Sequence, residues 1–184
     1  MNCLVSGATG FIGRQLCLQL RSDGHAVSAF SRRGGEVGDG LSVRSVDLAS
    51  EQLDDEQLRG IDIVFHLAGI AHRGAKATDH EALNHRATLR LARQASDAGV
   101  GCFLFISSVK AMGPAQSPGA RAEHDLAEPE DAYGLSKRQA ERDLCREFEQ
   151  ASMSVVIIRP ALVYGPDARG NLRQLARAVR WGLP

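Results

Sequence analysis

The sequence predicts an α/β protein with a doubly wound parallel sheet and helices on both of its faces. Three observations predict this class. Short apolar runs of strand length recur along the chain, each is followed by a segment with helical periodicity, and breaker-rich stretches separate them. Parallel strands are usually connected through helices, and they read as continuous apolar runs because both of their faces are buried. The alternation therefore indicates a parallel sheet.

The individual elements follow from the same patterns. Strands are expected at residues 3–5, 26–30, 61–67, 102–106 and 155–158. Apolar side chains recur every four residues on three helical segments, namely Ile12, Leu16 and Leu20, then Leu83, Ala87 and Leu91, and finally Ala140, Leu144 and Phe148. Residues 34–40, 69–77 and 113–129 are rich in breakers and are expected to be loops. In an open parallel sheet, the loops at the carboxyl ends of the strands carry the ligands.

Composition and charge narrow the class of partner. Of the 184 residues, 43% are hydrophobic and 24% are charged, so the chain can bury a core and lacks the signature of disorder. Lys and Arg number 22, as do Asp and Glu, which gives a formal net charge of zero. This balance removes the usual electrostatic argument for nucleic acid or an anionic membrane as the partner. Neither a repeat nor a linker divides the chain.

Cysteine usage and the N-terminal residues bear on the compartment. The four cysteines stand singly, without a CxxC pair or the spacing of metal ligands, and reduced thiols are expected. His66, His72 and His85 are spaced too irregularly for a metal site, so none is expected. The first residues lack the features of a signal peptide, and no apolar stretch approaches the ~18 residues of a membrane span. These features predict a cytoplasmic protein that does not enter a membrane.

A glycine pattern directly after the first strand predicts a dinucleotide site. Residues 6–13 read Ser-Gly-Ala-Thr-Gly-Phe-Ile-Gly, a GxxGxxG pattern that opens the first helix. Gly7 allows a tight turn, Gly10 lets the backbone approach a pyrophosphate, and Gly13 lets the helix pack closely on the sheet. The free amides and the positive end of the helix dipole then face the anion. The alternative is a structural glycine-rich turn, but the strand-turn-helix context favours the cofactor turn of a Rossmann-type fold.

The end of the second strand bears on the choice between NADP and NAD. A NAD site usually has a carboxylate there for the adenosine ribose, whereas this chain has Ser31, Arg32 and Arg33. Two guanidiniums and a hydroxyl suit a 2′-phosphate, so NADP is favoured. NAD stays open, because the following loop can bring Glu36 or Asp39 back to the site. An exposed basic strand end without a ligand is the other alternative.

Further motifs follow in a characteristic order. They are Asp47-Leu48, His66-Leu67-Ala68-Gly69, Asn84, the Ser107-Ser108 pair in residues 106–113, the YxxxK motif from Tyr133 to Lys137, the RPxxVYGP motif from Arg159 to Pro166, and Gly170-Asn171-Leu172. Together with the glycine turn, they resemble the extended short-chain dehydrogenase/reductase family, in its NAD(P)-dependent epimerase/dehydratase branch, which modifies nucleotide sugars. The resemblance covers nearly the whole chain.

The resemblance implies a cofactor site along the carboxyl edge of the sheet. It implies that Asp47 binds the adenine amino group, that residues 66–69 follow the ribose and the nicotinamide side, and that the backbone at Pro160 and Val163 approaches the carboxamide. Asn84 resembles the Asn of the family's VNxxGT pattern, although Ala87 stands where a Gly is usual. The expected cofactor-binding residues are Gly7, Thr9, Gly10, Phe11, Ile12, Gly13, Ser31, Arg32, Arg33, Asp47, Leu48, Leu67, Ala68, Gly69, Asn84, Tyr133, Lys137, Pro160 and Val163.

The resemblance also implies a catalytic set of Ser108, Tyr133 and Lys137. Tyr133 and Lys137 stand one helical turn apart and share a face. The pKa of a tyrosine is ordinarily about 10, so Lys137 is expected to lower it and to hold the nicotinamide ribose. Ser108 would orient a sugar oxygen with which Tyr133 exchanges a proton while hydride passes to or from the nicotinamide. Met112, where a Tyr is usual, weakens any stacking on the substrate. Taken singly, Tyr133 is better explained as an exposed aromatic and Lys137 as a solvated helix lysine, and only together with Ser108 and the glycine turn do they favour catalysis.

The resulting hypothesis is an NAD(P)-dependent 4-epimerase or 4-keto reductase of a nucleotide-linked sugar. Ser108 and Asn171 are the expected substrate contacts, the latter in a segment that resembles one reaching the substrate diphosphate. A noncatalytic NAD(P)-binding module is one alternative, although the retained Tyr133 and Lys137 count against it. An inactive cofactor-binding fragment is another, because family members continue well past Pro184.

On this interpretation residues 1–184 form an NAD(P)-binding Rossmann domain, residues 160–184 begin the substrate-binding part, and the substrate lobe is truncated. The resemblance further implies a homodimer through the helices that bear Asn84 and Tyr133. Two clusters of charge are interpreted as solvated surface in the first instance. They are the acidic loop residues Glu123, Asp125, Glu128, Glu130 and Asp131, and the final helical stripe of Arg173, Arg177 and Arg180.

Overall fold

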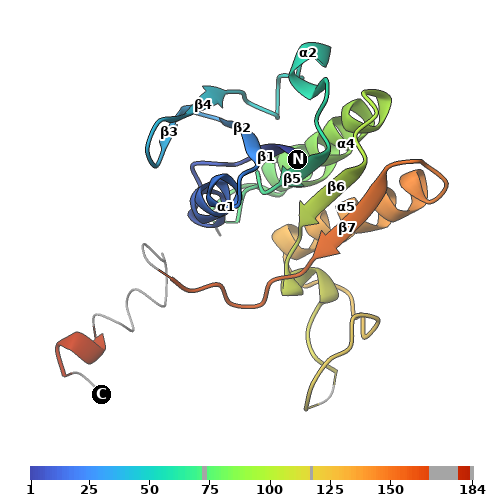
Figure 1. Ribbon diagram of the computed structural model, residues 1–184. Coiled ribbons are helices and arrows are strands. Elements are labelled where there is room, and N and C mark those ends of the chain that lie inside the picture. Colours follow the sequence, from blue (N-terminus) through green and yellow to red (C-terminus); the bar gives the residue numbers. More distant parts are fainter. Residues whose placement is uncertain (72–73, 117, 166–177, 183–184) are drawn as a thin grey trace.

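A seven-stranded, mostly parallel sheet forms the centre of the chain (Figure 1). The computed structural model describes residues 1–71, 74–116, 118–165 and 178–182. The strands are β1 Asn2–Ser6, β2 Ala26–Ser31, β3 Gly35–Val37, β4 Leu41–Ser45, β5 Ile63–His66, β6 Cys102–Ile106 and β7 Ser154–Ile158. Their order is β3-β4-β2-β1-β5-β6-β7, and every neighbouring pair is parallel except β3 with β4. The predicted Rossmann-type α/β class is confirmed.

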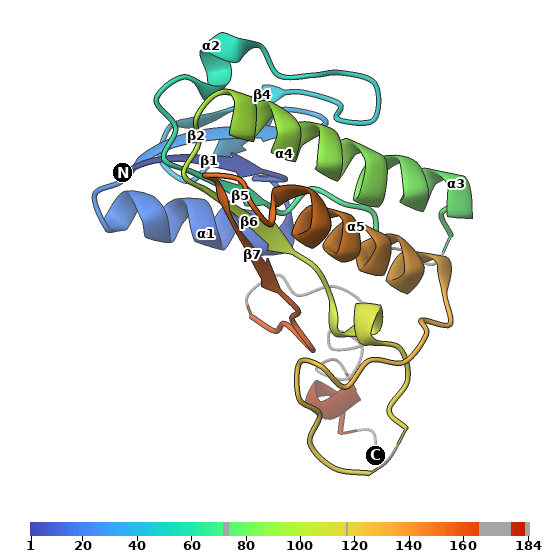
Figure 2. The ribbon, with the colours of Figure 1, turned by 90° about the vertical axis from the view of Figure 1, so that its right-hand side faces the viewer.

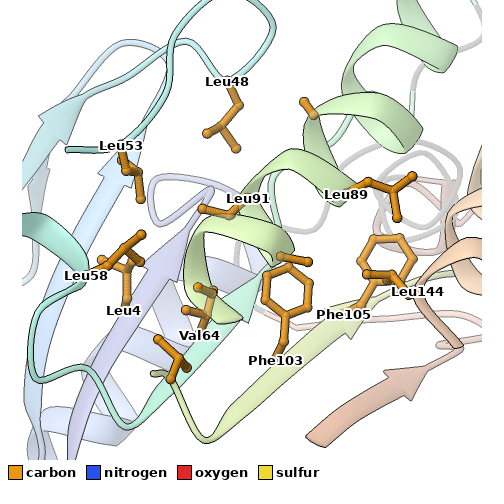
Figure 3. Packing of buried hydrophobic residues seen from close by; sticks show 14 of the residues in the cluster. Leu4, Leu48, Leu53, Leu58, Val64, Leu89, Leu91, Phe103, Phe105 and Leu144 are labelled. Carbon is orange, nitrogen blue, oxygen red and sulfur yellow. The ribbon is translucent and has the colours of Figure 1, made fainter. Parts of the chain in front are cut away.

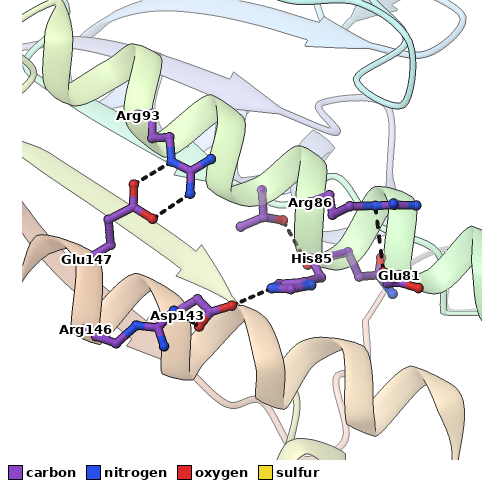
Figure 4. A network of polar contacts seen from close by, with 9 residues as sticks. Glu81, His85, Arg86, Arg93, Asp143, Arg146 and Glu147 are labelled. Carbon is purple, nitrogen blue, oxygen red and sulfur yellow. Dashed lines mark hydrogen bonds and ion pairs between the residues drawn. The ribbon is translucent and has the colours of Figure 1, made fainter.

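Helices lie on both faces of this sheet. They are α1 Phe11–Ser22, α2 Asp55–Leu58, α3 Ala77–His80, the π-helical turn η1 Glu81–Arg86, α4 Ala87–Asp97, the 3₁₀ turn η2 Val109–Met112 and α5 Ala132–Phe148. Figure 2 shows α1 on one face, and α4 and α5 side by side on the other. Polar contacts join η1 and α4 to α5, among them His85 Nε2 of η1 to Asp143 Oδ2 at 2.7 Å and Arg93 Nη2 of α4 to Glu147 Oε2 at 2.7 Å (Figure 4).

Alternation along the strands builds two apolar clusters. In β1, Leu4 packs into a cluster that contains Phe103 and Phe105 of β6 with Leu91 and Leu144 of the helices (Figure 3). The intervening residues of β1 belong to a second cluster, which includes Cys17 and Leu20 of α1. Successive side chains of a strand point to opposite faces, so both faces of this strand are buried. Packing on both faces therefore fixes the position of the central strands and of their carboxyl ends.

The segment between β2 and β4 differs from the prediction. Residues 34–40 were expected to be a loop, and a helix was expected after each strand, yet β3 forms here and pairs antiparallel with β4. Gly34 and Gly38 adopt φ values of 62° and 57°, a left-handed conformation that favours glycine and lets the chain reverse. Val37 of β3 is fully buried. The connection is thus a short hairpin arm instead of a helix.

Residues 77–97 form one helical rod that contains a π-helical turn. The φ and ψ angles stay helical at His80, Glu81, Arg86 and Ala87, where α3, η1 and α4 join. Asn84 lies in the π-helical turn and is fully buried. Such turns add one residue to a helical turn and often occur at functional sites.

The described residues contain no helix that is both long and apolar enough to cross a membrane. All four cysteines are free thiols. Within the described ranges, no group of three or more His, Cys, Asp or Glu residues could hold a metal ion. Of the residues assigned to the start of the substrate-binding part, 166–177 and 183–184 lie outside the described structure, and so do Asn171, Arg173 and Arg177.

Candidate active site

Two adjoining cavities form a cleft along the carboxyl ends of the strands. The first, of about 520 Å³, is lined by the turn after β1, the ends of β2 and β5, and residues 46–48. The second, of about 230 Å³, lies between the ends of β5, β6 and β7 and the start of α5. Leu67, Gly69, Ile70 and Ala71 line both cavities. The cleft is therefore continuous and elongated, as a dinucleotide requires.

The turn after β1 is built for close approach of backbone. Gly7 adopts a φ of 69°, and a Cβ atom placed there would lie 2.8 Å from the Ala68 nitrogen. A Cβ atom at Gly13 would lie 2.3 Å from the Gly7 oxygen. No side chain caps the N-terminus of α1, whose N-cap residue is Gly10. The first amides of this helix are thus available to an anion in the first cavity, which fits the diphosphate of a dinucleotide.

A buried chain of hydrogen bonds joins this turn to the helical rod. The Ser6 hydroxyl accepts hydrogen bonds from the amides of Leu67 and Ala68 at 3.0 and 3.1 Å, so it donates its own proton to His66 Nδ1 at 2.7 Å. His66 Nε2 then donates to the Thr88 hydroxyl at 2.9 Å, which donates to the Asn84 oxygen. Burial, aided by the nearby Lys137, lowers the pKa of His66 to about 3. His66 is therefore a neutral link between β5 and the helix.

Asn84 binds protein groups on three sides. Its Oδ1 accepts from the Ile70 amide at 2.8 Å, and its Nδ2 donates to the Ile70 oxygen at 3.0 Å and to the Ser136 hydroxyl at 3.1 Å. The side chain does not line either cavity. It fixes the loop after β5 against α5, so the structure places it behind the predicted cofactor surface and not on it.

The end of the first cavity beside β2 is basic at its rim. Exposed Arg32 and Arg33 line it, whereas buried Ser31 turns its hydroxyl to the Gly34 oxygen at 3.3 Å. Asp47 also lines it, and one of its carboxylate oxygens accepts from the Ala49 amide at 3.0 Å. Glu36 does not line the cavity and accepts from the Gly40 amide at 3.1 Å. The arm that includes β3 therefore does not return a carboxylate to the end of β2.

Ser108, Tyr133 and Lys137 come together in the second cavity. Lys137 is only 4% exposed, and its ammonium donates to the Ile106 oxygen at 2.8 Å and lies 4.4 Å from the centroid of the Phe105 ring. Burial lowers the pKa of Lys137 to about 7, against an opposing effect of Glu141. An amine poised in this way can release or take up a proton near neutral pH.

The pKa of Tyr133 is raised, not lowered as the sequence had suggested. Burial is the largest cause, and it is opposed by the close Ser108 side chain and by the positive charge of Lys110, while Asp131 adds to the rise. The expectation was wrong for this structure because the Lys137 ammonium is directed to the Ile106 oxygen and to the Phe105 ring. A lowered pKa of Tyr133 would therefore require positive charges other than that of Lys137.

A partly buried ion pair ties α5 to the ends of two strands. Glu141 of α5 accepts from Ser107 at the end of β6 and binds Arg159 after β7 through Nε at 2.9 Å and Nη2 at 2.8 Å. Bidentate pairs of this kind fix geometry as well as charge. The strand ends that carry Ser108 and Pro160 are therefore tied to the helix that carries Tyr133 and Lys137.

The sequence profile of the NAD dependent epimerase/dehydratase family matches residues 3–181. The chain belongs to this family. Among relatives with curated names, UDP-glucose 4-epimerase of Vibrio cholerae is 38% identical over 189 residues, which cover 98% of this chain and 57% of that protein. UDP-2-acetamido-2,6-beta-L-arabino-hexul-4-ose reductase of Pseudomonas aeruginosa is 30% identical over 172 residues, which cover 93% of this chain and 38% of that protein. The chain thus spans little more than half of the first relative.

Solved structures of the same family resemble the fold. MoeE5 in complex with UDP-glucose and NAD has a TM-score of 0.85 at 34% identity, with 97% of this chain and 60% of that chain covered. UDP-glucuronic acid 4-epimerase from Bacillus cereus in complex with NAD has a TM-score of 0.86 at 25% identity, with 100% of this chain and 64% of that chain covered. The cofactor named in both structures is NAD.

Most residues that the sequence assigned to the family's site line the cleft. The first cavity gathers Gly7, Thr9, Gly10, Ser31, Arg32, Arg33, Asp47, Leu48, Leu67, Ala68 and Gly69. The second gathers Ile12, Leu67, Gly69, Ser108, Tyr133, Lys137, Pro160 and Val163. Phe11, Gly13 and Asn84 do not line it, and Asn171 lies outside the described residues.

Sequence reasoning missed three groups near the family's tyrosine. They are Lys110, Asp131 and His80, whose ring centroid lies 5.9 Å from that of Tyr133. Asp131 had been interpreted as one of several solvated acids, yet it caps α5 by accepting from the Gly134 amide at 2.7 Å. An acidic residue directly before a helical pattern is a recognisable N-cap signal. No comparable signal marked Lys110.

Proposed function

We propose that this chain carries the cofactor and proton-transfer machinery of an NAD(P)-dependent oxidoreductase acting on a nucleotide-linked sugar, as a 4-epimerase or a 4-keto reductase. The observation that carries the proposal is the convergence of Ser108, Tyr133 and Lys137 in one cavity that continues into the cleft beside the glycine turn. Relatives named as UDP-glucose 4-epimerase and as a UDP-sugar 4-reductase support the substrate class.

The described residues divide the chemistry between them. A bound nicotinamide supplies the acceptor or donor of hydride. Tyr133 takes the proton of the sugar hydroxyl as the carbon is oxidised, and returns a proton to the carbonyl oxygen on reduction. Ser108 orients that oxygen by hydrogen bonding. In an epimerase both half-reactions occur on one sugar, so protons and electrons balance within a single turnover, whereas a reductase needs fresh NADH or NADPH each time.

Lys137 has two parts in this proposal. Its ammonium would donate to the ribose of the nicotinamide nucleoside when the cofactor is present, and its lowered pKa would let it exchange a proton near neutral pH. The contacts of the amine with the Phe105 ring and the Ile106 oxygen hold it in one position in the cavity. Both roles depend on the position of Lys137 along α5, a helix whose N-terminus is capped by Asp131.

The same cleft fits an adenine dinucleotide, and the finer proposal is a preference for NADP. The uncapped start of α1 and the backbone approach at Gly7 suit the diphosphate, and Asp47 is the acid nearest the adenine end. Arg32 and Arg33 support the 2′-phosphate, since the rim at the end of β2 carries no carboxylate to repel it. The solved structures of relatives contain NAD, which favours NAD over NADP.

A second copy of the chain is the protein partner that we propose. The homodimer would form through the helical rod of residues 77–97, which bears Asn84, and through α5, which bears Tyr133. Their shared surface is already ordered within one chain by the Arg93–Glu147 and His85–Asp143 contacts (Figure 4). Light scattering of the purified protein measures this directly, and a monomer at micromolar concentration would contradict it.

Product analysis tests the proposed activity. The protein, in a full-length or complemented form that binds sugar nucleotides, is incubated with UDP-glucose, UDP-glucuronic acid or a UDP-4-keto sugar, with NAD or NADPH, and the sugar is examined by NMR. A configurational change at C4, or reduction of the keto sugar, is the expected result. A 3-oxo acid is included as a non-sugar substrate, because 2-alkyl-3-oxoalkanoate reductase of Stenotrophomonas maltophilia is also a relative, at 28% identity. Reduction of that compound alone would overturn the assignment to nucleotide sugars.

A further inference from the structure

Lys110 is fixed beside the reacting end of the cleft by two contacts. It follows Ser108 by two residues in η2, and its amide donates to the Ser108 hydroxyl at 3.2 Å. Its ammonium forms an ion pair with Asp131 and lies 5.9 Å from the centroid of the Tyr133 ring. One residue thus contacts the serine through its backbone and approaches the tyrosine with its charge.

Asp131 determines where this ammonium lies. One of its carboxylate oxygens accepts from the Gly134 amide at 2.7 Å and so caps α5, while the other pairs with Lys110. The backbones also meet closely, because a Cβ atom at Gly134 would lie 2.7 Å from the Lys110 oxygen. Tyr133 lies between the cap and this glycine, in the first turn of α5. The lysine and the start of the tyrosine's helix are therefore joined by both side-chain and backbone contacts.

Lys137 is directed elsewhere. Its ammonium is occupied by the Ile106 oxygen and by the face of the Phe105 ring. Among the causes that act on the Tyr133 phenol, the positive charge is that of Lys110, and it favours the phenolate. The other groups that face Tyr133 are the Ser108 hydroxyl, the Asp131 carboxylate and the His80 ring from α3.

We propose that Lys110, held by Asp131, is a positioning residue for Tyr133 that supplies the cation beside the phenol and aligns it with Ser108. A neighbouring positive charge favours the ionised phenol, which is the form that takes up a proton. The inference rests on the proposed function only where it gives Tyr133 an acid/base role. The electrostatic coupling of the two residues is a property of the protein without substrate.

The test is a spectroscopic titration of Tyr133 in the cofactor-free protein at low salt. Absorbance at the phenolate band is followed against pH, and the curve of the same protein carrying Tyr133→Phe is subtracted, which leaves the signal of this one phenol. Far-UV circular dichroism at each pH shows that the fold persists. The subtraction is made for the parent, Lys110→Met, Lys110→Gln and Lys110→Arg, and for Arg44→Met as a matched control.

The variants are expected to order by charge. Lys110→Met and Lys110→Gln should raise the titration midpoint of Tyr133 by about half to one pH unit, because a half-exposed cation at this distance exerts a screened effect. Gln retains a donor for Asp131, so the rise does not depend on loss of that contact. Arginine keeps its charge throughout the pH range of the titration. The permanently charged Arg should therefore give the lowest midpoint.

Arg44→Met removes one positive charge from β4, far along the sheet from β6, and should leave the midpoint unchanged. A midpoint in folded Lys110→Met or Lys110→Gln that equals the parent's, or an Arg44→Met shift of the same size, would overturn the proposal. Failure of the proposed function would give a different experimental result. It would appear as absence of sugar turnover in the full-length or complemented form, with the titration order of the parent and the three Lys110 variants intact.

Discussion

Lys137 places an amine where water scarcely reaches it, and this has a consequence for stability. In the unfolded chain a lysine keeps its proton up to about pH 10.4. In the folded chain Lys137 loses it near pH 7. Between these values the unfolded state binds more protons, so the free energy of unfolding rises with pH across this window.

We therefore expect Lys137→Met, which removes the cost of burying the charge, to be more stable than the parent at and below pH 7, by on the order of a few kcal/mol without cofactor. That advantage should shrink steadily towards pH 10. Urea unfolding at several pH values measures it. Parallel stability curves for the two proteins, with a constant difference across the window, would contradict the lowered pKa.

Cofactor preference belongs to the residue scale as well. Arg32 and Arg33 are exposed at the rim, where a guanidinium is free to bind a 2′-phosphate bidentately. We expect NADPH to bind more tightly than NADH, and Arg32→Ala to weaken NADPH alone by at least about tenfold, since a charged hydrogen bond contributes about 1.5–3 kcal/mol. Fluorescence titration of both cofactors decides the matter. Equal affinities in the parent would show that the basic rim is solvated surface.

Motif spacing could predict which side chains line the cleft, but not how each of them acts. Tyr133 and Lys137 meet in one cavity because a helix fixes their separation. Asn84 was assigned to the cofactor, yet the hydrogen bonds of its side chain, with Ile70, His80 and Ser136, are all to the protein. The Lys110–Asp131 pair joins residues 21 positions apart across an irregular loop, and no local pattern encodes that meeting.

At the scale of elements, the junction of β1 with α1 is the most constrained part of the cleft. Gly13 has helical backbone and lies in the first turn of α1, but a methyl group there would approach the Gly7 oxygen to 2.3 Å. Since that contact is with backbone, it can be relieved only by moving the turn or the helix.

We expect Gly13→Ala to lower cofactor affinity by at least about tenfold and to destabilise the fold by ~1–3 kcal/mol, within the range for overpacked sites. Gly74→Ala is the matched control, because a Cβ atom there meets nothing within 4 Å and its φ is not left-handed. Thermal unfolding and cofactor titration of both variants measure the effect. Equal thermal stability and equal cofactor affinity of the two variants would show that the turn accommodates a methyl group without strain.

Five of the six parallel strands could be predicted because each is an apolar run long enough to be recognised, whereas polar residues interrupt β4, Leu41–Ser45, which was not predicted. β3 could not, since it has three residues and a single buried side chain, Val37, and it depends on pairing with β4. The π-helical turn was equally invisible, because Leu83, Ala87 and Leu91 keep helical spacing while one residue is accommodated between hydrogen bonds. Local periodicity thus predicts helix and strand, but not their irregularities.

At the scale of the molecule, the described residues complete the cofactor cleft more fully than the substrate side. The chain spans 57% of the Vibrio cholerae epimerase, and the predicted substrate contact Asn171 lies outside the described residues. On β7, Val156 and Ile158 remain 41% and 42% exposed. Exposed apolar side chains on a sheet are typical of a surface that another segment or chain covers.

We therefore expect these 184 residues alone to bind NADPH or NADH well and nucleotide sugars poorly. Calorimetry of the isolated chain with the two cofactors and with UDP-glucose and UDP-glucuronic acid measures both. A sugar nucleotide that binds as tightly as the cofactor would show that the substrate site is complete within these residues.

The central claim is that Tyr133 exchanges the proton in the reaction that this fold supports. The most direct test is the turnover number of Tyr133→Phe relative to the parent, in the protein that turns over sugar, at saturating cofactor and substrate. The substitution removes one hydroxyl and leaves the ring, α5 and the first cavity in place. Turnover should fall by about 10²-fold or more with cofactor affinity nearly unchanged. Turnover retained in Tyr133→Phe while Lys137→Met loses it would contradict the assignment, because the proton would then come from another group.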